Sequence, residues 1–99
     1  MKIVAVTACP TGIAHTYMAA EKLERAAKKL GHSIKVETQG AMGIENALTA
    51  ADVKGADVVI LAAGIEVRER ERFDGKRVVE TAVQDAIRNP EGILASLAS

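Results

Sequence analysis

The single cysteine of this 99-residue chain, Cys9, stands where an apolar segment gives way to a helical pattern. A thiol attacks as its thiolate, which the N–H groups and the dipole of a helix N-terminus stabilise. The same N–H groups have no partner inside the helix and can bind the oxygens of a phosphoryl group. One loop can therefore favour both the free nucleophile and its phosphorylated form. These properties predict that Cys9 can carry a phosphoryl group.

The residues after the cysteine suit an anion-binding loop. Pro10 cannot extend a strand and Gly12 permits a positive φ, so the chain must turn here. The hydroxyls of Thr11 and Thr16 can donate to phosphate oxygens, and a protonated His15 can stabilise a thiolate or a bound phosphate. Turn formation, helix capping and exposure to solvent explain the same residues without a ligand. The candidate phosphate-binding loop consists of Pro10, Thr11, Gly12, Ile13, Ala14, His15 and Thr16.

Other site chemistries lack their characteristic residues. Cysteine-dependent phosphatases place an arginine six positions after the cysteine, and that position holds His15 here. No glycine pattern of a dinucleotide or nucleoside-triphosphate site follows the first apolar segment. Cys9, His15 and His32 are too few and too scattered for a zinc site, and His32 is expected to be exposed. We therefore expect no metal and no cofactor. The alternative to a phosphoryl-carrying Cys9 is a buried, chemically inert cysteine. Gln39, Gly40 and Met42 are candidates for a second wall of the site, with a plain connection as the simpler interpretation.

Composition limits the partners and the compartment. Lys and Arg together number 13, as do Asp and Glu, so no net charge draws the chain to nucleic acid. The longest apolar run, residues 58–65, is too short to span a bilayer, and the N-terminus has no signal-peptide pattern. One cysteine allows no internal disulfide. We expect a cytoplasmic protein with no transmembrane segment of its own.

Apolar segments alternate with helical patterns along the whole chain. This order predicts a single three-layer α/β domain over residues 1–99, with a core from about residue 2 to 97 and helices on both faces of a parallel, Rossmann-like sheet. Ligands bind such sheets at the carboxyl ends of the strands, where the strand order reverses. If the strand order is 2-1-3-4, that point is the end of the first strand, at Cys9. The expected strands are residues 2–7, 33–38 (an edge strand), 56–63 and 76–80.

Helix boundaries follow from capping residues and glycines. The first helix should run from about Thr16 to Gly31, with apolar residues at helical spacing. Capping-box pairs predict two further helix starts, and an Asn-Pro pair predicts the start of the last helix. These signals are Thr49 with Asp52, Thr81 with Gln84, and Asn89 with Pro90. Residues 39–43 are expected to be a loop, and the alternating Glu/Arg run 66–72 a solvated loop or short helix anchored by Phe73.

The block from Ala8 to Thr16, together with Glu37-Thr38-Gln39-Gly40, closely resembles the fructose-type IIB component of the bacterial phosphoenolpyruvate-dependent sugar phosphotransferase system. The likeness runs from residue 2 to about 90. It implies that Cys9 accepts a phosphoryl group from a phosphohistidine of EIIA and passes it to fructose or a related sugar in the membrane component EIIC. It also implies a phosphotransferase whose phosphate loop is residues 10–16, and a four-stranded sheet of order 2-1-3-4. The alternatives are a low-molecular-weight cysteine phosphatase or arsenate reductase-like enzyme, and a regulatory binding module.

Overall fold

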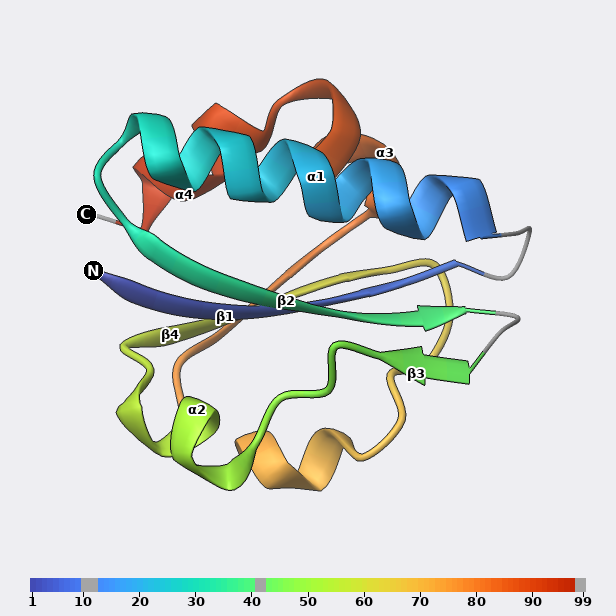
Figure 1. The fold of residues 1–99 in the computed structure, drawn as a ribbon, viewed down its shortest axis with the longest axis vertical. Helices are drawn as coiled ribbons and strands as arrows, with labels where there is room; N and C mark the ends of the chain where they lie inside the picture. Colours follow the sequence, from blue (N-terminus) through green and yellow to red (C-terminus); the bar gives the residue numbers. More distant parts are fainter. Residues whose placement is uncertain (10–12, 41–42, 98–99) are drawn as a thin grey trace.

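Two apolar strands, β1 (Lys2–Ala8) and β4 (Val58–Ala63), lie side by side in the middle of the sheet (Figure 1). Nearly every residue in them is buried, as their unbroken apolar runs predict. The computed structural model describes residues 1–9, 13–40 and 43–97. Within these ranges the other elements are strands β2 (Ser33–Gly40), β3 (Gly43–Glu45) and β5 (Val78–Thr81), and helices α1 (Ile13–Lys29), α2 (Ala50–Gly55), η1 (Arg70–Phe73, a 3₁₀ helix), α3 (Val83–Arg88) and α4 (Pro90–Ser96).

The described strands form one sheet of order β3-β2-β1-β4-β5. Strands β2, β1, β4 and β5 are parallel, which confirms the predicted order 2-1-3-4 for these four. The predicted number of strands is wrong, because β3 returns antiparallel to the end of β2 and pairs Glu45 with Thr38. Three residues are too few to show an alternating pattern. Strand β2 is therefore covered at its carboxyl end, where the sequence predicted an edge strand. The predicted loop 39–43 is wrong at Gln39, Gly40 and Gly43, which belong to β2 and β3, and its residues Ala41 and Met42 lie outside the described residues.

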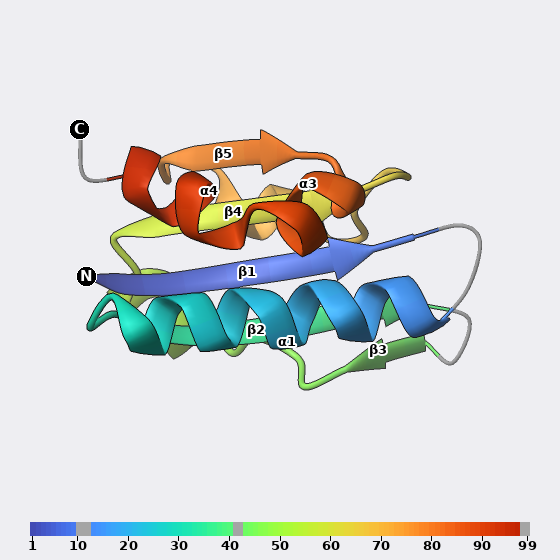
Figure 2. The ribbon, with the colours of Figure 1, turned by 90° about the horizontal axis from the view of Figure 1, so that it is seen from above.

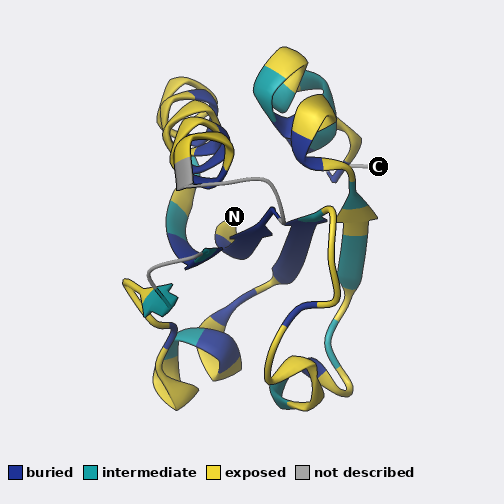
Figure 3. Ribbon diagram, turned by 90° about the vertical axis from the view of Figure 1, so that its right-hand side faces the viewer, coloured by how far each residue is buried: buried dark blue, intermediate teal, exposed yellow. Residues whose placement is uncertain are grey.

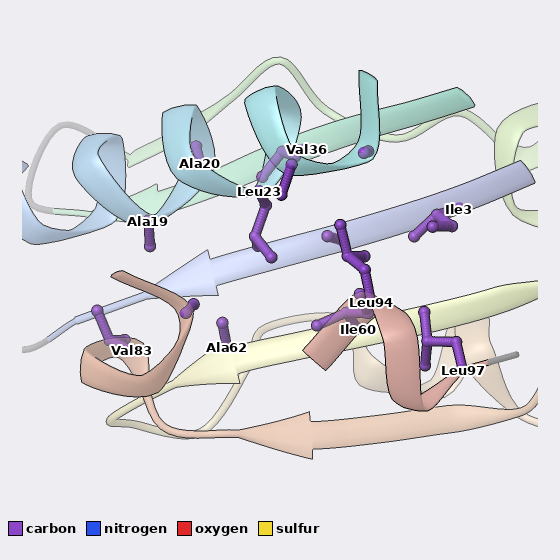
Figure 4. Close-up of a cluster of buried hydrophobic side chains, with 14 of the residues drawn as sticks. Ile3, Ala19, Ala20, Leu23, Val36, Ile60, Ala62, Val83, Leu94 and Leu97 are labelled. Atoms are coloured by element: carbon purple, nitrogen blue, oxygen red, sulfur yellow. The ribbon is translucent and has the colours of Figure 1, made fainter. Parts of the chain in front are cut away.

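The larger helices cover one face of the sheet, called here the α1 face. Helix α1 lies over β1 and β2, whereas α3 and α4 lie over the other side of the same face (Figure 2). Most buried side chains of this face are apolar, beside the buried threonines Thr7, Thr16 and Thr38, and Figure 4 shows helical and strand residues meeting in one cluster. Its largest fully buried members are Ile3, Leu23, Val36, Val58, Ile60, Leu94 and Leu97.

The opposite face, called here the α2 face, is covered by the short helices α2 and η1 (Figure 1). Its apolar cluster is smaller and includes Leu61, Val67 and Phe73. Phe73 is 2% exposed, so its predicted role as an anchor is confirmed. Helices on both faces give the predicted three layers. A fully buried carboxylate, Glu37, also lies on this face, and the sequence did not predict it.

Two of the three predicted helix caps are present in the structure, and one is not. Thr49 and Asp52 form the expected capping box, and the Asn89 side chain accepts a hydrogen bond from Gly92 N at the start of α4. The box predicted at Thr81 is wrong, because Thr81 belongs to β5 and α3 has no side-chain cap. Helix α1 begins at Ile13, before the predicted start, and ends as predicted with a positive-φ glycine, Gly31. His32 is half-buried, not exposed.

Candidate functional site

Cys9 directly follows β1 at the carboxyl edge of the sheet, the edge that faces the viewer in Figure 3. The residue is 7% exposed and belongs to the apolar cluster of the α1 face. Parallel pairing aligns the ends of three strands here, because Ala8 lies between Gln39 of β2 and Ala63 of β4. The thiol therefore lies at the strand ends where the order of the sheet reverses, as predicted.

His15 approaches the thiol from the first turn of α1. Its Nδ1 lies 3.7 Å from Cys9 Sγ, and its side chain is exposed. The first-turn N–H groups of α1 have no partner inside the helix. Both the helix N-terminus and a protonated imidazole favour a thiolate over a thiol. This arrangement can activate the sulfur and then bind the charge of a group transferred to it.

The rest of the predicted phosphate loop is only partly described. Pro10, Thr11 and Gly12 lie outside the described residues, and for Ile13 the structure gives only its place at the start of α1. Ala14 is exposed in the first turn of α1.

Thr16 belongs to the same turn of α1, but it faces inward. It is 1% exposed, and its carbonyl accepts a hydrogen bond of 3.1 Å from the Thr7 hydroxyl. A Cβ at Gly40 would lie 3.6 Å from Thr16 Oγ1, so this hydroxyl packs against the end of β2. The structure therefore brings Cys9 and His15 together and places Thr16 behind them.

A second wall of this edge is the segment 64–68 that leaves β4. Gly64 N donates a hydrogen bond of 2.8 Å to Ala8 O, the residue before Cys9. Val67 is 5% exposed and packs in the cluster of the α2 face, whereas Ile65 is 45% exposed. The segment therefore begins beside the cysteine and turns under the sheet.

A polar network on the α2 face, near the strand ends, was not predicted from the sequence. Glu37 is fully buried on β2, and its two oxygens accept hydrogen bonds of 2.9 and 2.5 Å from the guanidinium of Arg72. Leu48 N and Gln39 Nε2 also donate to this carboxylate. Burial raises the pKa of Glu37, but the hydrogen bonds from Arg72, Gln39 and Leu48 outweigh it, and the net pKa lies below its ordinary value.

The expectation of a solvated Glu/Arg run is correct for most of its residues and wrong for two of them. Val67 is buried, and the Arg72 side chain is only 20% exposed and lies over the ring of Phe73. No local pattern marks Glu37 as buried; the nearest signal is Gln39, a second polar residue two positions away on the same face of β2.

The β2–β3 hairpin is tied to α1 near this edge. The Tyr17 hydroxyl of α1 donates a hydrogen bond to the Glu45 carboxylate of β3. That hydrogen bond raises the pKa of Tyr17, because ionisation would place two negative charges together. Within the described ranges no group of His, Cys, Asp and Glu side chains is placed to hold a metal ion. Across those same ranges no helix combines the length and the apolar composition needed to cross a bilayer.

Comparisons with known sequences give consistent relatives. The family model "PTS system, Lactose/Cellobiose specific IIB subunit" matches residues 4–96. The PTS system fructose-like EIIB component 2 of Escherichia coli (strain K12) is 54% identical over 96 residues, covering 97% of this chain and 91% of that protein. The fructose-like PTS system EIIBC component of the same strain is 52% identical over 99 residues, covering 98% of this chain and 20% of that longer protein.

Solved structures have the same fold. A domain of the fructose-specific IIABC component (PTS system) from Borrelia burgdorferi has a TM-score of 0.91 at 56% identity, covering 95% of this chain and 89% of that one. An arsenate reductase in its phosphate-binding state has a TM-score of 0.57 at 15% identity, covering 97% of this chain and 98% of that one, which is a likeness of fold alone. With a family model matching nearly the whole chain and a relative 54% identical along it, this chain belongs to the PTS IIB family as a fructose-type EIIB domain.

Proposed function

We propose that this chain carries a phosphoryl group on Cys9 between two components of a sugar phosphotransferase system. The donor is a phosphohistidine of an EIIA component, and the acceptor is fructose or a related sugar held by the membrane component EIIC. The observation that carries the proposal is the position of Cys9 Sγ at the N-terminus of α1, 3.7 Å from His15 Nδ1. The fructose-like names of the relatives favour the choice of sugar.

The proposed chemistry is two displacements at phosphorus. In the first, the Cys9 thiolate attacks the phosphorus, an S–P bond forms, the N–P bond of the phosphohistidine breaks, and its electron pair stays on the departing imidazole. In the second, a sugar hydroxyl attacks the same phosphorus and an O–P bond forms. The S–P bond breaks, its electron pair stays on the Cys9 sulfur as the thiolate, and the hydroxyl proton passes to water. In this proposal the first-turn amides of α1 and His15 stabilise the transferred charge in both steps. Residues 10–16 form the phosphate loop.

The partners and the place of action follow from the same proposal. A relative in which this domain forms part of an EIIBC protein supports EIIC as one partner. EIIA is proposed as the other partner because a histidine-bound phosphoryl group must be delivered to the sulfur. We propose that residues 1–99 act as one EIIB domain in the cytoplasm, at the cytoplasmic face of the membrane when bound to EIIC.

Phosphorylation by a purified donor tests the proposal. Incubation with phosphorylated EIIA of a fructose-type system should add one acid-labile phosphoryl group to the wild-type chain and none to Cys9→Ser. The matched control is His32→Gln, which should be labelled like the wild type, because this histidine follows α1 at the opposite end from Cys9. A phosphoryl group on either histidine, or a labelled Cys9→Ser chain, would overturn the proposal. Steady hydrolysis of p-nitrophenyl phosphate would instead favour the phosphatase alternative.

A further inference from the structure

The side chain of Gln39 binds the main chain of a distant residue at the carboxyl edge of the sheet. Its Oε1 accepts a hydrogen bond of 2.8 Å from Arg68 N, and its Nε2 donates one of 3.1 Å to Arg68 O. The amide thus pairs with Arg68 as a neighbouring strand would. Gln39 lies beside Ala8 in the strand register, so this contact holds the segment 64–68 under the strand end that leads to Cys9.

The Gln39 amide has one possible orientation in this network. Its Nε2 also donates to Glu37 Oε2 at 2.7 Å, and Glu37 is itself bound by Arg72. A flipped amide would direct its oxygen at the Glu37 carboxylate and at the Arg68 carbonyl, three acceptors without a donor. Gln39 is 4% exposed, so water cannot readily replace these partners. The buried ion pair therefore fixes the amide, and the amide fixes Arg68.

The segment 64–68 is fixed near its two ends and exposed at its tip. One end is the bond from Gly64 N to Ala8 O, and the other is the pairing of Arg68 with Gln39, beside the buried Val67. The tip, Ile65 and Glu66, is exposed. Ile65 and Glu66 line a cleft of about 510 Å³ together with Arg70, Glu80 and Thr81. Because side chains of the tip face this cleft, its position depends on the contacts at the two ends of the segment.

We propose that Gln39 is a positioning residue for phosphoryl transfer: it holds the segment 64–68, which is bonded through Gly64 N to the residue before Cys9, as a preformed wall against which the phosphohistidine-bearing protein docks. This inference rests on the proposed function. It assigns Gln39 no contact with the phosphoryl group and no part in activating the sulfur. If Ile65 is already held in place, the donor gains an apolar contact with it and little conformational entropy is lost on binding.

The variant Gln39→Met keeps the shape of the side chain and removes both bonds to Arg68. Titration with phosphorylated EIIA should give a KM for the donor about fivefold to tenfold higher, with kcat within about twofold of the wild type. The rate of Cys9 alkylation by iodoacetamide should keep its wild-type dependence on pH, because the sulfur and His15 are untouched. The matched control, Gln84→Met on the exposed surface of α3, should leave the KM unchanged.

Three results would overturn the inference: an unchanged KM, a fall in kcat together with a displaced alkylation profile, or a loss of activity equal to the unfolded fraction. Amide hydrogen exchange of the wild-type chain decides the matter if Gln39→Met does not fold. The Arg68 amide should exchange at least tenfold more slowly than the Glu66 amide, and equal rates would refute the pairing. Absence of phosphorylation at Cys9 in the wild type would instead refute the proposed function.

Discussion

The two faces of the sheet are built on different physical principles. The α1 face is closed by apolar side chains of α1, α3 and α4, whereas the α2 face holds the buried ion pair of Glu37 and Arg72. Apolar contacts are non-directional and depend on volume, but hydrogen bonds and ion pairs fix orientation. Cys9 belongs to the first face, and the segment 64–68 is held by the second. The comparison suggests that one face supplies stability and the other positions the wall of the site.

Truncation of the apolar face should give the largest loss of stability. Leu23 of α1 is fully buried, so Leu23→Ala removes packed volume and should lower the free energy of unfolding by about 3 to 4 kcal/mol. Urea denaturation followed by circular dichroism measures the change. Leu30→Ala is the control, since Leu30 is 42% exposed, and it should cost less than about 0.5 kcal/mol. Equal losses of unfolding free energy in the two variants would contradict the idea that packed volume determines the stability of the α1 face.

Removal of one charge should be the most damaging change on the α2 face. Glu37→Gln keeps the volume but leaves Arg72 without its counter-charge, and should cost about 2 to 3 kcal/mol, less than a fully buried pair because Arg72 is 20% exposed. The control is Glu80→Gln, which breaks the exposed ion pair with Arg70 and should cost less than about 0.5 kcal/mol. Urea denaturation would contradict the prediction if the two variants were equally stable.

The sequence predicted the α1 face better than the α2 face because its signals are local. Unbroken apolar runs such as residues 58–63 and helical spacing in α1 report burial directly. A glutamate in an alternating strand normally indicates a solvated face, and its partner Arg72 lies 35 residues away. Burial of Glu37 depends on a tertiary contact that no local pattern contains. Strand β3 was missed for a similar reason, since its three residues are defined only by pairing with β2.

The candidate site divides in the same way. Cys9 and His15 are 6 residues apart in the chain, so their proximity follows from a strand followed by a helix. The pairing of Gln39 with Arg68 joins residues 29 apart in the chain, which only the folded sheet brings together. The sequence indicated Gln39 as part of a second wall, but not the main-chain group that it binds. The proximity of Cys9 and His15 was therefore predictable from the sequence, and the tertiary contact of Gln39 with Arg68 was not.

The pH dependence of stability should come in part from the α2 face. The net pKa of Glu37 is lowered in the folded chain, so its carboxylate contributes stability above its unfolded value, and this contribution is lost as the pH falls through the folded pKa. The wild type should lose stability in acid faster than Glu37→Gln, and the difference between them should shrink below about pH 4.5. Thermal unfolding between pH 7 and pH 3 measures both curves.

A control for this pH dependence is Asp52, whose pKa is lowered to about 2 by the hydrogen bond from Lys35 and those from Thr49. Asp52→Asn should also flatten the acid limb, but it should leave the Glu37 contribution in place. The double variant should therefore be flatter than either single variant. Parallel curves for the wild type and Glu37→Gln would show that Glu37 does not contribute to the pH dependence of stability. The proposed electrostatic difference between the two faces would then be wrong.

The smallest effects should come from the helix caps, one on each face. Thr49→Ala removes the acceptor of Asp52 N at the start of α2, and Asn89→Ala removes the acceptor of Gly92 N at the start of α4. Each should cost about 1 kcal/mol. Helix α4 is also held by the fully buried Leu94, whereas α2 buries only Val53. Loss of its cap should therefore fray α2 more than α4, and amide exchange should accelerate along all of α2 but only in the first turn of α4. Equal fraying of the two helices would indicate that the α2 face is as firmly packed as the α1 face.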